Sequence, residues 1–357
     1  MFKKIIAAIL CFSMLLAIIG CGAGNPSVEE VSNPEPSSSE PPQPTYYVNP
    51  LTGVKNLLEE QRELRPVAVM INNINVAQGV QTGVQKADIV YETEVEGGIT
   101  RLLAVYKDIS VLNALGTIRS ARYPYIELAL GHDAIYVHHG MDYTYAKPYL
   151  SSSGVAAINI GSPYAYREKN GLATEHTLYT DAEKLKAGIE AKKFRSTTTK
   201  NDTFANFTAD DEKIVPSEGG AVTATVKFSN YATSIFTYNE QTGLYTKNTK
   251  GKTNKDVKSG ETYDFKNVFV LATTVSYYPD NKHRKVALNS GSGYYVSEGG
   301  YQAITWQKGS GSASFKFFAA DGSELKVNAG NSWVCLHSKE FAPKFEAPAP
   351  ETSSAVQ

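Results

Sequence analysis

The amino terminus constrains this chain most, because it limits which residues are left to fold. A short basic segment precedes an almost wholly apolar stretch, residues 5–19, which ends at Gly20 and Cys21. About 15 apolar residues are too few for a comfortable membrane span, which needs roughly 20, but they match the apolar core of a secretory signal. Two branched aliphatic residues before Gly20 and Cys21 are typical of a lipobox. We therefore predict a lipoprotein signal peptide at residues 1–20.

Cys21 is the predicted lipidation site, where the thiol receives a diacylglycerol before the signal is cleaved. Two or more acyl chains hold a protein stably at a membrane, whereas one chain binds only marginally. An uncleaved membrane anchor in which Cys21 is incidental is the alternative. Lipidation predicts a mature protein that begins at Cys21 and lies on the outer face of the cytoplasmic membrane, with the lipid anchor as its contact with that membrane.

Both ends of the remaining chain are predicted to be disordered. Residues 21–57 are rich in proline, serine and glutamate, and such a segment buries too little apolar surface to offset its ordering entropy. Its prolines make it an extended, semi-stiff spacer. Residues 341–357 have a similar composition and are predicted to form a second disordered end. Roughly 290 residues lie between these two predicted disordered ends, a length that favours two domains.

Composition excludes several kinds of protein. The chain encodes three cysteines: Cys11 leaves with the signal and Cys21 is lipidated, so Cys335 has no partner for an internal disulfide. Cys335 lies in an apolar, strand-like run and is predicted to be a core residue rather than a nucleophile. Without its two signal lysines the chain has 33 basic and 36 acidic side chains. This slightly acidic balance and the exported location argue against a nucleic-acid partner.

The first half of the body alternates strand and helix signals. Strands are predicted at residues 67–71, 88–96, 100–106 and 134–137, with a hairpin turn at Gly97-Gly98. Helices are predicted at residues 120–130, 142–150 and 181–192, with Ser120 and Asp181 as amino-terminal caps. The pattern predicts an α/β or α+β domain with a mixed sheet over residues 58–205.

The second half has a different texture, with short segments rich in Thr, Val, Tyr and Phe between turn residues. Strands are predicted at residues 222–228, 233–238, 268–275, 293–296, 301–306, 313–318 and 332–336. Residues 238–245 form a predicted hairpin, and residues 320–323 form an Asp-Gly type turn. A mainly β domain is therefore predicted over residues 215–340.

Arginines in the segment from Gly116 to Arg122 give the strongest candidate for a binding site. Arg119, Ser120 and Arg122 lie at the start of the predicted helix, where free N–H groups and the helix dipole favour an anion. Guanidinium groups bind phosphate or carboxylate bidentately. With Arg101 from a neighbouring strand, these residues are predicted to bind an anion.

An internal ion-pair network is the alternative for these arginines. Glu92, Glu94 and Glu96 are spaced two residues apart, so an extended strand places all three on one face. Carboxylates on that face would neutralise the arginines without any ligand.

Further polar and aromatic residues are candidates for a functional pocket. The candidate pocket or acid–base residues are Glu92, Glu96, His138, His139, Asp142 and His176. No recognised metal-binding spacing is present, and no metal or other cofactor is predicted. Trp306 and Trp333 are a candidate sugar-stacking platform, with burial in the core as the alternative.

Five segments in one order resemble the YerB family of Gram-positive lipoproteins. These segments are residues 65–73, 87–92, 96–101, 116–122 and 175–180, and residues 305–308 and 329–333 resemble the paired tryptophan motifs of the family. The resemblance implies an N-terminal domain followed by a C-terminal β domain. It also implies a role in the cell envelope, alongside wall-synthesis proteins.

Three hypotheses about function follow. The leading one is a cell-envelope lipoprotein that binds a wall-assembly partner or an anionic wall polymer. The second is a hydrolase or transferase that acts on phosphate-bearing or glycan substrates with an arginine clamp and a histidine acid–base. The third is a solute-binding lipoprotein of a transporter, which the unlike textures of the two halves disfavour.

Overall fold

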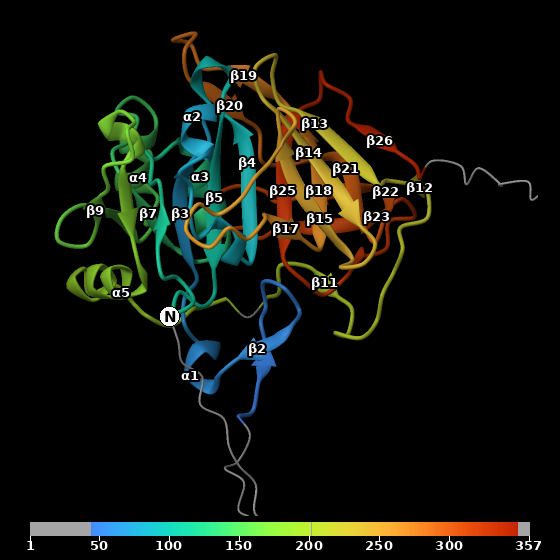
Figure 1. Ribbon diagram of the computed structural model, residues 1–357, viewed down its shortest axis with the longest axis horizontal. Coiled ribbons are helices and arrows are strands. Elements are labelled where there is room, and N and C mark those ends of the chain that lie inside the picture. The colour runs from blue at the N-terminus through green and yellow to red at the C-terminus, as the bar shows by residue number, and fades with distance from the viewer. Residues whose placement is uncertain (1–43, 201, 349–357) are drawn as a thin grey trace, which may run out of the picture. The chain divides into compact units, whose positions relative to one another are not determined.

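An eleven-stranded mixed sheet runs through both halves of the chain in the computed structural model, which describes residues 44–200 and 202–348 (Figure 1). Its strand order is β12-β22-β21-β18-β25-β4-β5-β3-β7-β8, and β23 pairs with β22. The strands are β3 (Val67–Asn72), β4 (Ile89–Glu94), β5 (Thr100–Tyr106), β7 (Ile135–His138), β8 (Ala157–Asn159), β12 (Gly219–Gly220), β18 (Asn267–Thr273), β21 (Ser290–Ser297), β22 (Gly300–Gln307), β23 (Lys316–Ala319) and β25 (Ser332–Ser338).

The two halves of the sequence meet inside this sheet. Strand β25, near the end of the chain, pairs in parallel with β4, and Val90 lies opposite Trp333. On its other edge β25 pairs in parallel with β18. All described residues consequently belong to a single compact unit. The mixed sheet in the first half and the mainly β second half confirm the predicted fold class.

A second sheet of six strands packs against the C-terminal part of the first. Its strands are β13 (Thr223–Lys227), β14 (Thr233–Asn239), β15 (Leu244–Thr249), β16 (Lys252–Thr253), β17 (Asp264–Phe265) and β26 (Lys344–Glu346). Phe236 and Phe265 from this sheet contact Trp333, with ring centroids 5.9 and 5.1 Å from the indole. The predicted hairpin at residues 238–245 is confirmed, because Tyr238 pairs with Tyr245.

Three two-stranded sheets and one three-stranded sheet, in which β10 is the central strand, accompany the two main sheets. They are β1 (Tyr47–Val48) with β2 (Lys55–Leu57), β6 (Leu115–Gly116) with β10 (Leu178–Thr180) and β9 (Tyr166–Arg167), β11 (Asn206–Phe207) with β24 (Lys326–Val327), and β19 (Val275–Tyr277) with β20 (Arg284–Val286).

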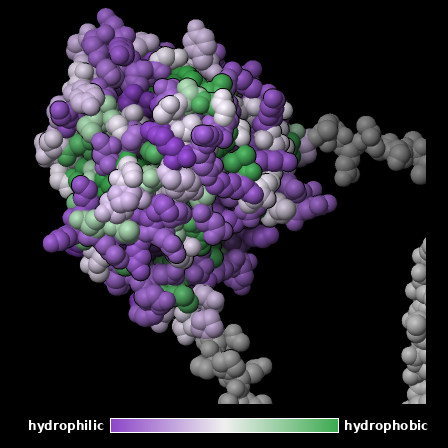
Figure 2. Space-filling view, turned by 60° about the vertical axis from the view of Figure 1, so that its left-hand side comes forward, coloured by the Kyte–Doolittle hydropathy of each residue, from purple (hydrophilic) through white to green (hydrophobic). Residues whose placement is uncertain are grey.

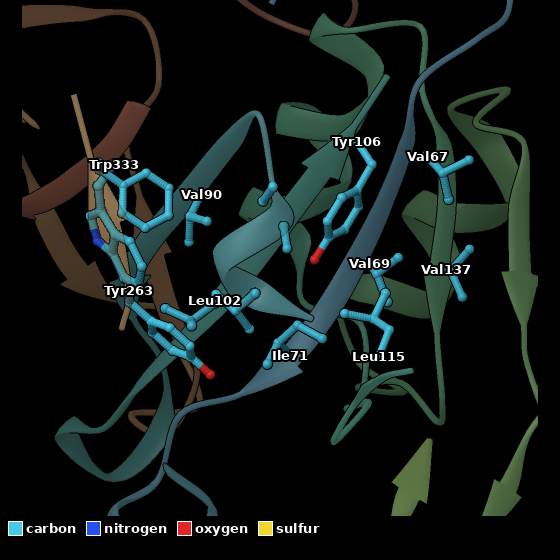
Figure 3. Packing of buried hydrophobic residues seen from close by; sticks show 14 of the residues in the cluster. Val67, Val69, Ile71, Val90, Leu102, Tyr106, Leu115, Val137, Tyr263 and Trp333 are labelled. Carbon is cyan, nitrogen blue, oxygen red and sulfur yellow. The ribbon is translucent and has the colours of Figure 1, made fainter. Parts of the chain in front are cut away.

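Strand β3 shows why the apolar runs of the first half become buried strands. Its side chains alternate between two cores, with Val67, Val69 and Ile71 on one face (Figure 3). Ala68 and Met70 pack into the core on the other face. Because both faces are covered, the strand reads as a continuous apolar run rather than as an alternating one.

Five α-helices accompany the sheets in the described part of the chain. They are α1 (Glu59–Arg62), α2 (Asn75–Gln78), α3 (Tyr123–Gly131), α4 (Ala146–Ser152) and α5 (Ala182–Ala191), and short 3₁₀ turns occur at Val84–Lys86, Glu96–Gly98 and Thr174–His176. No helix here is long and apolar enough to span a membrane. On the face shown in Figure 2, hydrophilic residues predominate and apolar residues are scattered between them.

The predicted helix caps differ in outcome. Asp181 caps α5, because its carboxylate accepts a hydrogen bond of 2.8 Å from the Lys184 N–H. Ser120 does not cap α3, which begins only at Tyr123. The reason is that Arg119 and Ala121 donate their backbone N–H groups to Met70 and Gly140, so this segment is already hydrogen-bonded to neighbouring strands and loops.

Both ends that are predicted to be disordered contain ordered strands among the described residues. Residues 47–57 of the predicted tether form the β1–β2 hairpin, with Leu51 and Leu57 buried. Residues 344–346 of the predicted tail add β26 to the edge of the second sheet. Apolar side chains between the prolines make this order possible. The signal peptide, residues 21–43 with Cys21, and residues 349–357 lie outside the described residues.

Candidate functional site

The segment between β6 and α3 carries Arg119 and Arg122 to the end of the large sheet where Arg101 of β5 lies. Its backbone is hydrogen-bonded on both sides: Asn72 donates to the Thr117 carbonyl, and His139 donates to the Arg119 carbonyl. The segment therefore bridges the carboxyl ends of β3 and β7, which run parallel. Polar side chains that follow these two strands are held beside the arginines.

Arg101 is the most unusual member of this cluster. Arg101 is only 5% exposed, and the one side-chain hydrogen bond that it makes among the described residues runs from Nη1 to the Ser120 carbonyl at 2.5 Å. Within the described residues no carboxylate forms an ion pair with it. Burial, together with the nearby guanidinium of Arg122, lowers the pKa of Arg101 to about 9. The side chain is still charged at neutral pH, so a buried positive charge lacks a direct counterion.

The two other arginines are neutralised to different degrees. Arg122 Nε donates to both oxygens of Glu96 at 2.7 and 2.8 Å. Arg119 Nη2 lies 3.5 Å from Glu175, whose side chain is 55% exposed, and its buried Nε has no partner among the described residues. Arg101 and Arg119 thus retain N–H donors and positive charge for a ligand, whereas Glu96 already neutralises Arg122.

The alternative of one ion-pair network is wrong for two of the three glutamates. Only Glu96 pairs with a predicted arginine. Glu94 instead pairs with Arg284 from β20 at 2.5 Å. Glu92 points into the core between the two sheets, where Ser234 of β14 and Trp333 of β25 donate hydrogen bonds to it.

Glu92 is the acceptor at the centre of a buried polar network. Oε1 accepts from Asn73 at 3.0 Å and Thr100 at 2.8 Å, and Oε2 accepts from Ser234 at 2.9 Å and the indole N–H of Trp333 at 3.1 Å. With four donors and 1% exposure, this carboxylate is fully satisfied within the protein. It is therefore not available as an acid–base group.

His176 lies in a chain of polar side chains that leads to Arg119. Asn72 Nδ2 is 2.7 Å from His176 Nδ1, and Asn72 Oδ1 accepts from the Ile74 N–H at 3.4 Å. This orientation of the amide makes Nδ1 the acceptor, so the ring proton is on Nε2. That nitrogen lies 3.4 Å from Glu175, the same carboxylate that Arg119 contacts.

His139 borders the same edge of the sheet through Arg167. Its Nδ1 lies 2.6 Å from the Ile160 carbonyl, and its Nε2 lies 3.3 Å from Nη2 of Arg167. Arg167 also donates from Nη1 to the Thr174 carbonyl, just before Glu175. The structure thus joins Arg119, His139 and His176 through shared neighbours, as hydrogen-bonded pairs rather than as one enclosed pocket.

His138 and Asp142 hold the local backbone, and Asp142 also lies 3.0 Å from Nε2 of His283, which is 3.9 Å from Glu96, the partner of Arg122. His138 is buried, and its Nδ1 lies 2.7 Å from the Gly140 carbonyl; burial lowers its pKa to about 4, so it stays neutral. Asp142 accepts N–H bonds from Thr144, Tyr145 and Ala146 at 2.8 to 2.9 Å, and so organises the turn before α4.

The predicted aromatic platform is wrong. Trp306 and Trp333 are both completely buried. The Trp306 indole donates to the Ser292 carbonyl at 3.1 Å, and the Trp333 indole donates to Glu92. Trp306 and Trp333 each pack inside a hydrophobic core cluster, so neither ring can stack on a ligand. Cys335 is likewise buried and unpaired, as predicted.

Asn72 and Arg167 belong to the site but were not predicted from the sequence. Asn72 directly follows the predicted strand 67–71, and this position is the only sequence signal that could have identified it. Arg167 has no such signal, because it reaches His139 only through tertiary structure. No cluster of three metal-ligating side chains is found in the residues that the structure describes.

Comparisons with known proteins agree with this architecture. Residues 51–195 match the model of the N-terminal domain of DUF3048, a protein of unknown function, and residues 224–334 match its C-terminal domain. YerB of Bacillus subtilis (strain 168), described as a candidate lipoprotein, is 29% identical over 293 residues, which cover 80% of this chain and 84% of YerB. The crystal structure of YerB superimposes with a TM-score of 0.72 at 25% identity, covering 84% of this chain and 99% of that one.

Proposed function

The chain belongs to the DUF3048 family and is homologous to YerB, and from this premise we propose that it is a cell-envelope lipoprotein whose body binds an anionic wall component. Cys21 carries the lipid in this proposal, and the body lies on the outer face of the cytoplasmic membrane. The homology to a candidate lipoprotein and the lipobox of the sequence support the anchor.

Arg101 is the observation that supports an anionic ligand. Buried charges in proteins are normally paired, because an unpaired charge is costly to remove from water. Arg101 is buried beside two further arginines, and Glu96, a carboxylate that acts on its charge, is already paired with Arg122. A bound phosphate or carboxylate would supply the missing counterion, with Arg119 as the second guanidinium.

Thermal unfolding of the purified whole chain in detergent, with and without pyrophosphate, tests this proposal. At a hundred times its dissociation constant, a bound ligand stabilises the protein by about 2.7 kcal/mol. Arg101→Met should abolish this shift while leaving the unliganded protein equally or more stable, because replacing a buried charge by an apolar side chain of similar volume is often stabilising. Arg62→Met, at an exposed arginine, is the matched control and should retain the shift.

Two results would overturn the anion site. One is loss of stability in Arg101→Met without pyrophosphate, which would make the arginine a structural residue. The other is the absence of any shift in a protein that unfolds cooperatively, which would direct attention to a protein partner of wall assembly.

The lipid anchor has its own test in cells that produce the protein. Metabolic labelling with an alkyne fatty acid should mark the wild-type chain and not Cys21→Ala. Protease added to cells without an outer membrane or wall should digest the body of the wild-type protein. Labelling that survives in Cys21→Ala would contradict the anchor without affecting the anion site.

A hydrolase or transferase is the second candidate, because Arg119 and His176 share Glu175. In this arrangement Asn72 fixes the ring tautomer, and the Nε2 proton points toward the arginine cluster. The Nε2–H of neutral His176 would then donate a hydrogen bond to the negative charge that develops on a group held by Arg119. Release of phosphate from phosphate esters, lost in His176→Gln with pyrophosphate binding retained, is the expected result; no release by the wild-type protein would contradict catalysis.

A further inference from the structure

A polar groove lies where the two halves of the chain meet, on the other side of the end of β3 from the arginine cluster. Asn72 points toward His176, whereas the next side chain, Asn73, lines a cavity of about 220 Å³. A second cavity of about 580 Å³ adjoins the first. The two share Asn75, Gln78, Thr249 and Lys250 in their walls, so together they form one continuous groove.

Both halves of the sequence build this groove. Helix α2 and the β4–β5 turn supply one wall. The turns between β13 and β14 and between β15 and β16 supply the other. The rigid sheet beneath holds these turns, because the Glu92 network ties Asn73 and Thr100 to Ser234 across the two halves. The groove therefore has a fixed floor.

Amides and hydroxyls dominate the first cavity. Asn73, Asn75, Gln78, Thr100, Thr233 and Ser234 line it, and Tyr231 stands at its edge with 73% exposure. The carboxylate of Glu92 also lines this cavity, but all four of its hydrogen bonds come from protein donors. Side-chain amides and hydroxyls present donors and acceptors without charge, and an exposed tyrosine ring offers a flat apolar face beside a hydroxyl. This combination suits the hydroxyl groups and ring faces of a sugar.

Positive charge dominates the second cavity. Lys250, Lys252 and Lys255 line it and are exposed. Within residues 44–200 and 202–348, no carboxylate forms an ion pair with any of the three. The neighbouring Asp256 is buried and accepts from the Gly83, Lys258 and Ser259 N–H groups, so it does not neutralise them. This end of the groove carries uncompensated positive charge.

We infer that the groove binds an extended anionic glycan, with sugar units in the amide-lined cavity and acidic groups along the three lysines. The combined volume of the two cavities argues for an oligomer, because it lies in the range of ligand sites, roughly 300 to 1,000 Å³. Both cavities are open to solvent. This inference rests on the groove alone and needs neither the arginine cluster nor the lipid anchor.

Isothermal titration of the purified whole chain in detergent with three oligomers of about ten units tests the inference. The oligomers are oligogalacturonate as an anionic glycan, dextran as a neutral glycan and polyphosphate as an anion without sugar. Oligogalacturonate should bind best, and its affinity should fall as salt screens the lysines.

Charge reversal locates the binding site. Lys250→Glu, Lys252→Glu and Lys255→Glu together should weaken oligogalacturonate binding by on the order of a hundredfold. Lys186→Glu, Lys192→Glu and Lys316→Glu make the same change in charge at exposed lysines elsewhere and should retain binding. Thermal unfolding of both triple variants shows whether they fold like the wild type.

Each other outcome contradicts the inference. Equal weakening in both triple variants would mean that only net charge matters. Equal or tighter binding of polyphosphate would remove the glycan from the assignment. Absence of oligogalacturonate binding would remove the groove as a glycan site, while the pyrophosphate shift that depends on Arg101 would be unaffected.

Discussion

At the scale of single residues, buried polar groups explain more of this protein than exposed ones do. Glu92 accepts four hydrogen bonds, and Lys247, which is 1% exposed, lies 5.1 Å from the centroid of the Trp333 ring. The carboxylate is also an electrostatic partner of Lys247, whose pKa burial lowers. One side chain thus satisfies donors from both halves of the chain.

We predict that Glu92→Ala destabilises the fold by about 3 kcal/mol or more, because each buried donor left without an acceptor costs roughly 1–3 kcal/mol. Urea unfolding monitored by circular dichroism measures the change. Glu240→Ala, at an exposed turn glutamate, should stay within about 0.5 kcal/mol of the wild type. A small effect of Glu92→Ala would show that water replaces the carboxylate.

Buried His138 makes stability depend on pH. Burial lowers its pKa in the folded state to about 4, below the value of about 6.5 in the unfolded chain. Between these values the unfolded state binds more protons, so protonation favours unfolding as the pH falls. Asp88 acts in the opposite direction, because burial raises its pKa to about 6.

We therefore predict that lowering the pH from 7 to 5 costs the wild type about 1–2 kcal/mol more stability than it costs His138→Asn. The asparagine can still donate to the Gly140 carbonyl but cannot titrate. Urea unfolding of both proteins at several pH values isolates this contribution, since Asp88 and the other buried groups are common to both. Parallel pH curves would mean that His138 is hydrated in the folded state.

At the scale of elements, local sequence decided α5 and tertiary contacts decided α3. In α5, Asp181 caps the first turn and Leu185 anchors the helix in the core. In α3, Arg122 occupies the capping position without a side-chain hydrogen bond, because the residues before it are paired with β3 and the β7 loop.

For α5 we predict that Asp181→Ala costs about 1 kcal/mol, the usual effect of losing an amino-terminal cap. Asp181→Asn should cost much less, because asparagine also accepts from the Lys184 N–H. The exposed contact between Asp181 and the Lys184 ammonium should add little. Equal losses in the two variants, measured by thermal unfolding, would attribute the effect to charge rather than to the cap.

At the scale of the whole molecule, the parallel pairing of β4 with β25 makes the two family domains into one sheet. Neither half can cover its own central strands. Without β25, strand β4 would expose an unpaired edge, and without β4 the Trp333 indole would lose its hydrogen-bond acceptor Glu92. The groove inferred above exists only because of this arrangement.

We predict that the chain unfolds in a single cooperative transition, with tryptophan fluorescence and circular dichroism giving the same midpoint. Trp306 and Trp333 report on the C-terminal half, and helical circular dichroism reports mainly on α3, α4 and α5 in the N-terminal half. Two separated midpoints would show that the halves fold independently despite the shared sheet.

The sequence by itself determined where strands and hairpins form, because apolar periodicity and turn residues are local. Strands β3, β4 and β5, the turn at Gly97-Gly98 and the cap at Asp181 all follow from neighbouring residues. Proximity of Arg119 to Arg122 was predictable for the same reason, since they are only three positions apart in the sequence. The lipobox that predicts Cys21 as the anchor is also a local pattern.

Only the tertiary structure decided which side chains are buried together. Periodicity states that a strand has two faces, but not what covers them, so Trp306 and Trp333 could be read as a platform. Glu92 and Glu96 belong to the same two-residue spacing in the sequence but have different surroundings in the structure. Glu92 lies under the second sheet, and Glu96 lies beside Arg122. The pairing of β4 with β25 joins residues more than 200 positions apart, and long-range contacts of this kind leave no signal in a local pattern.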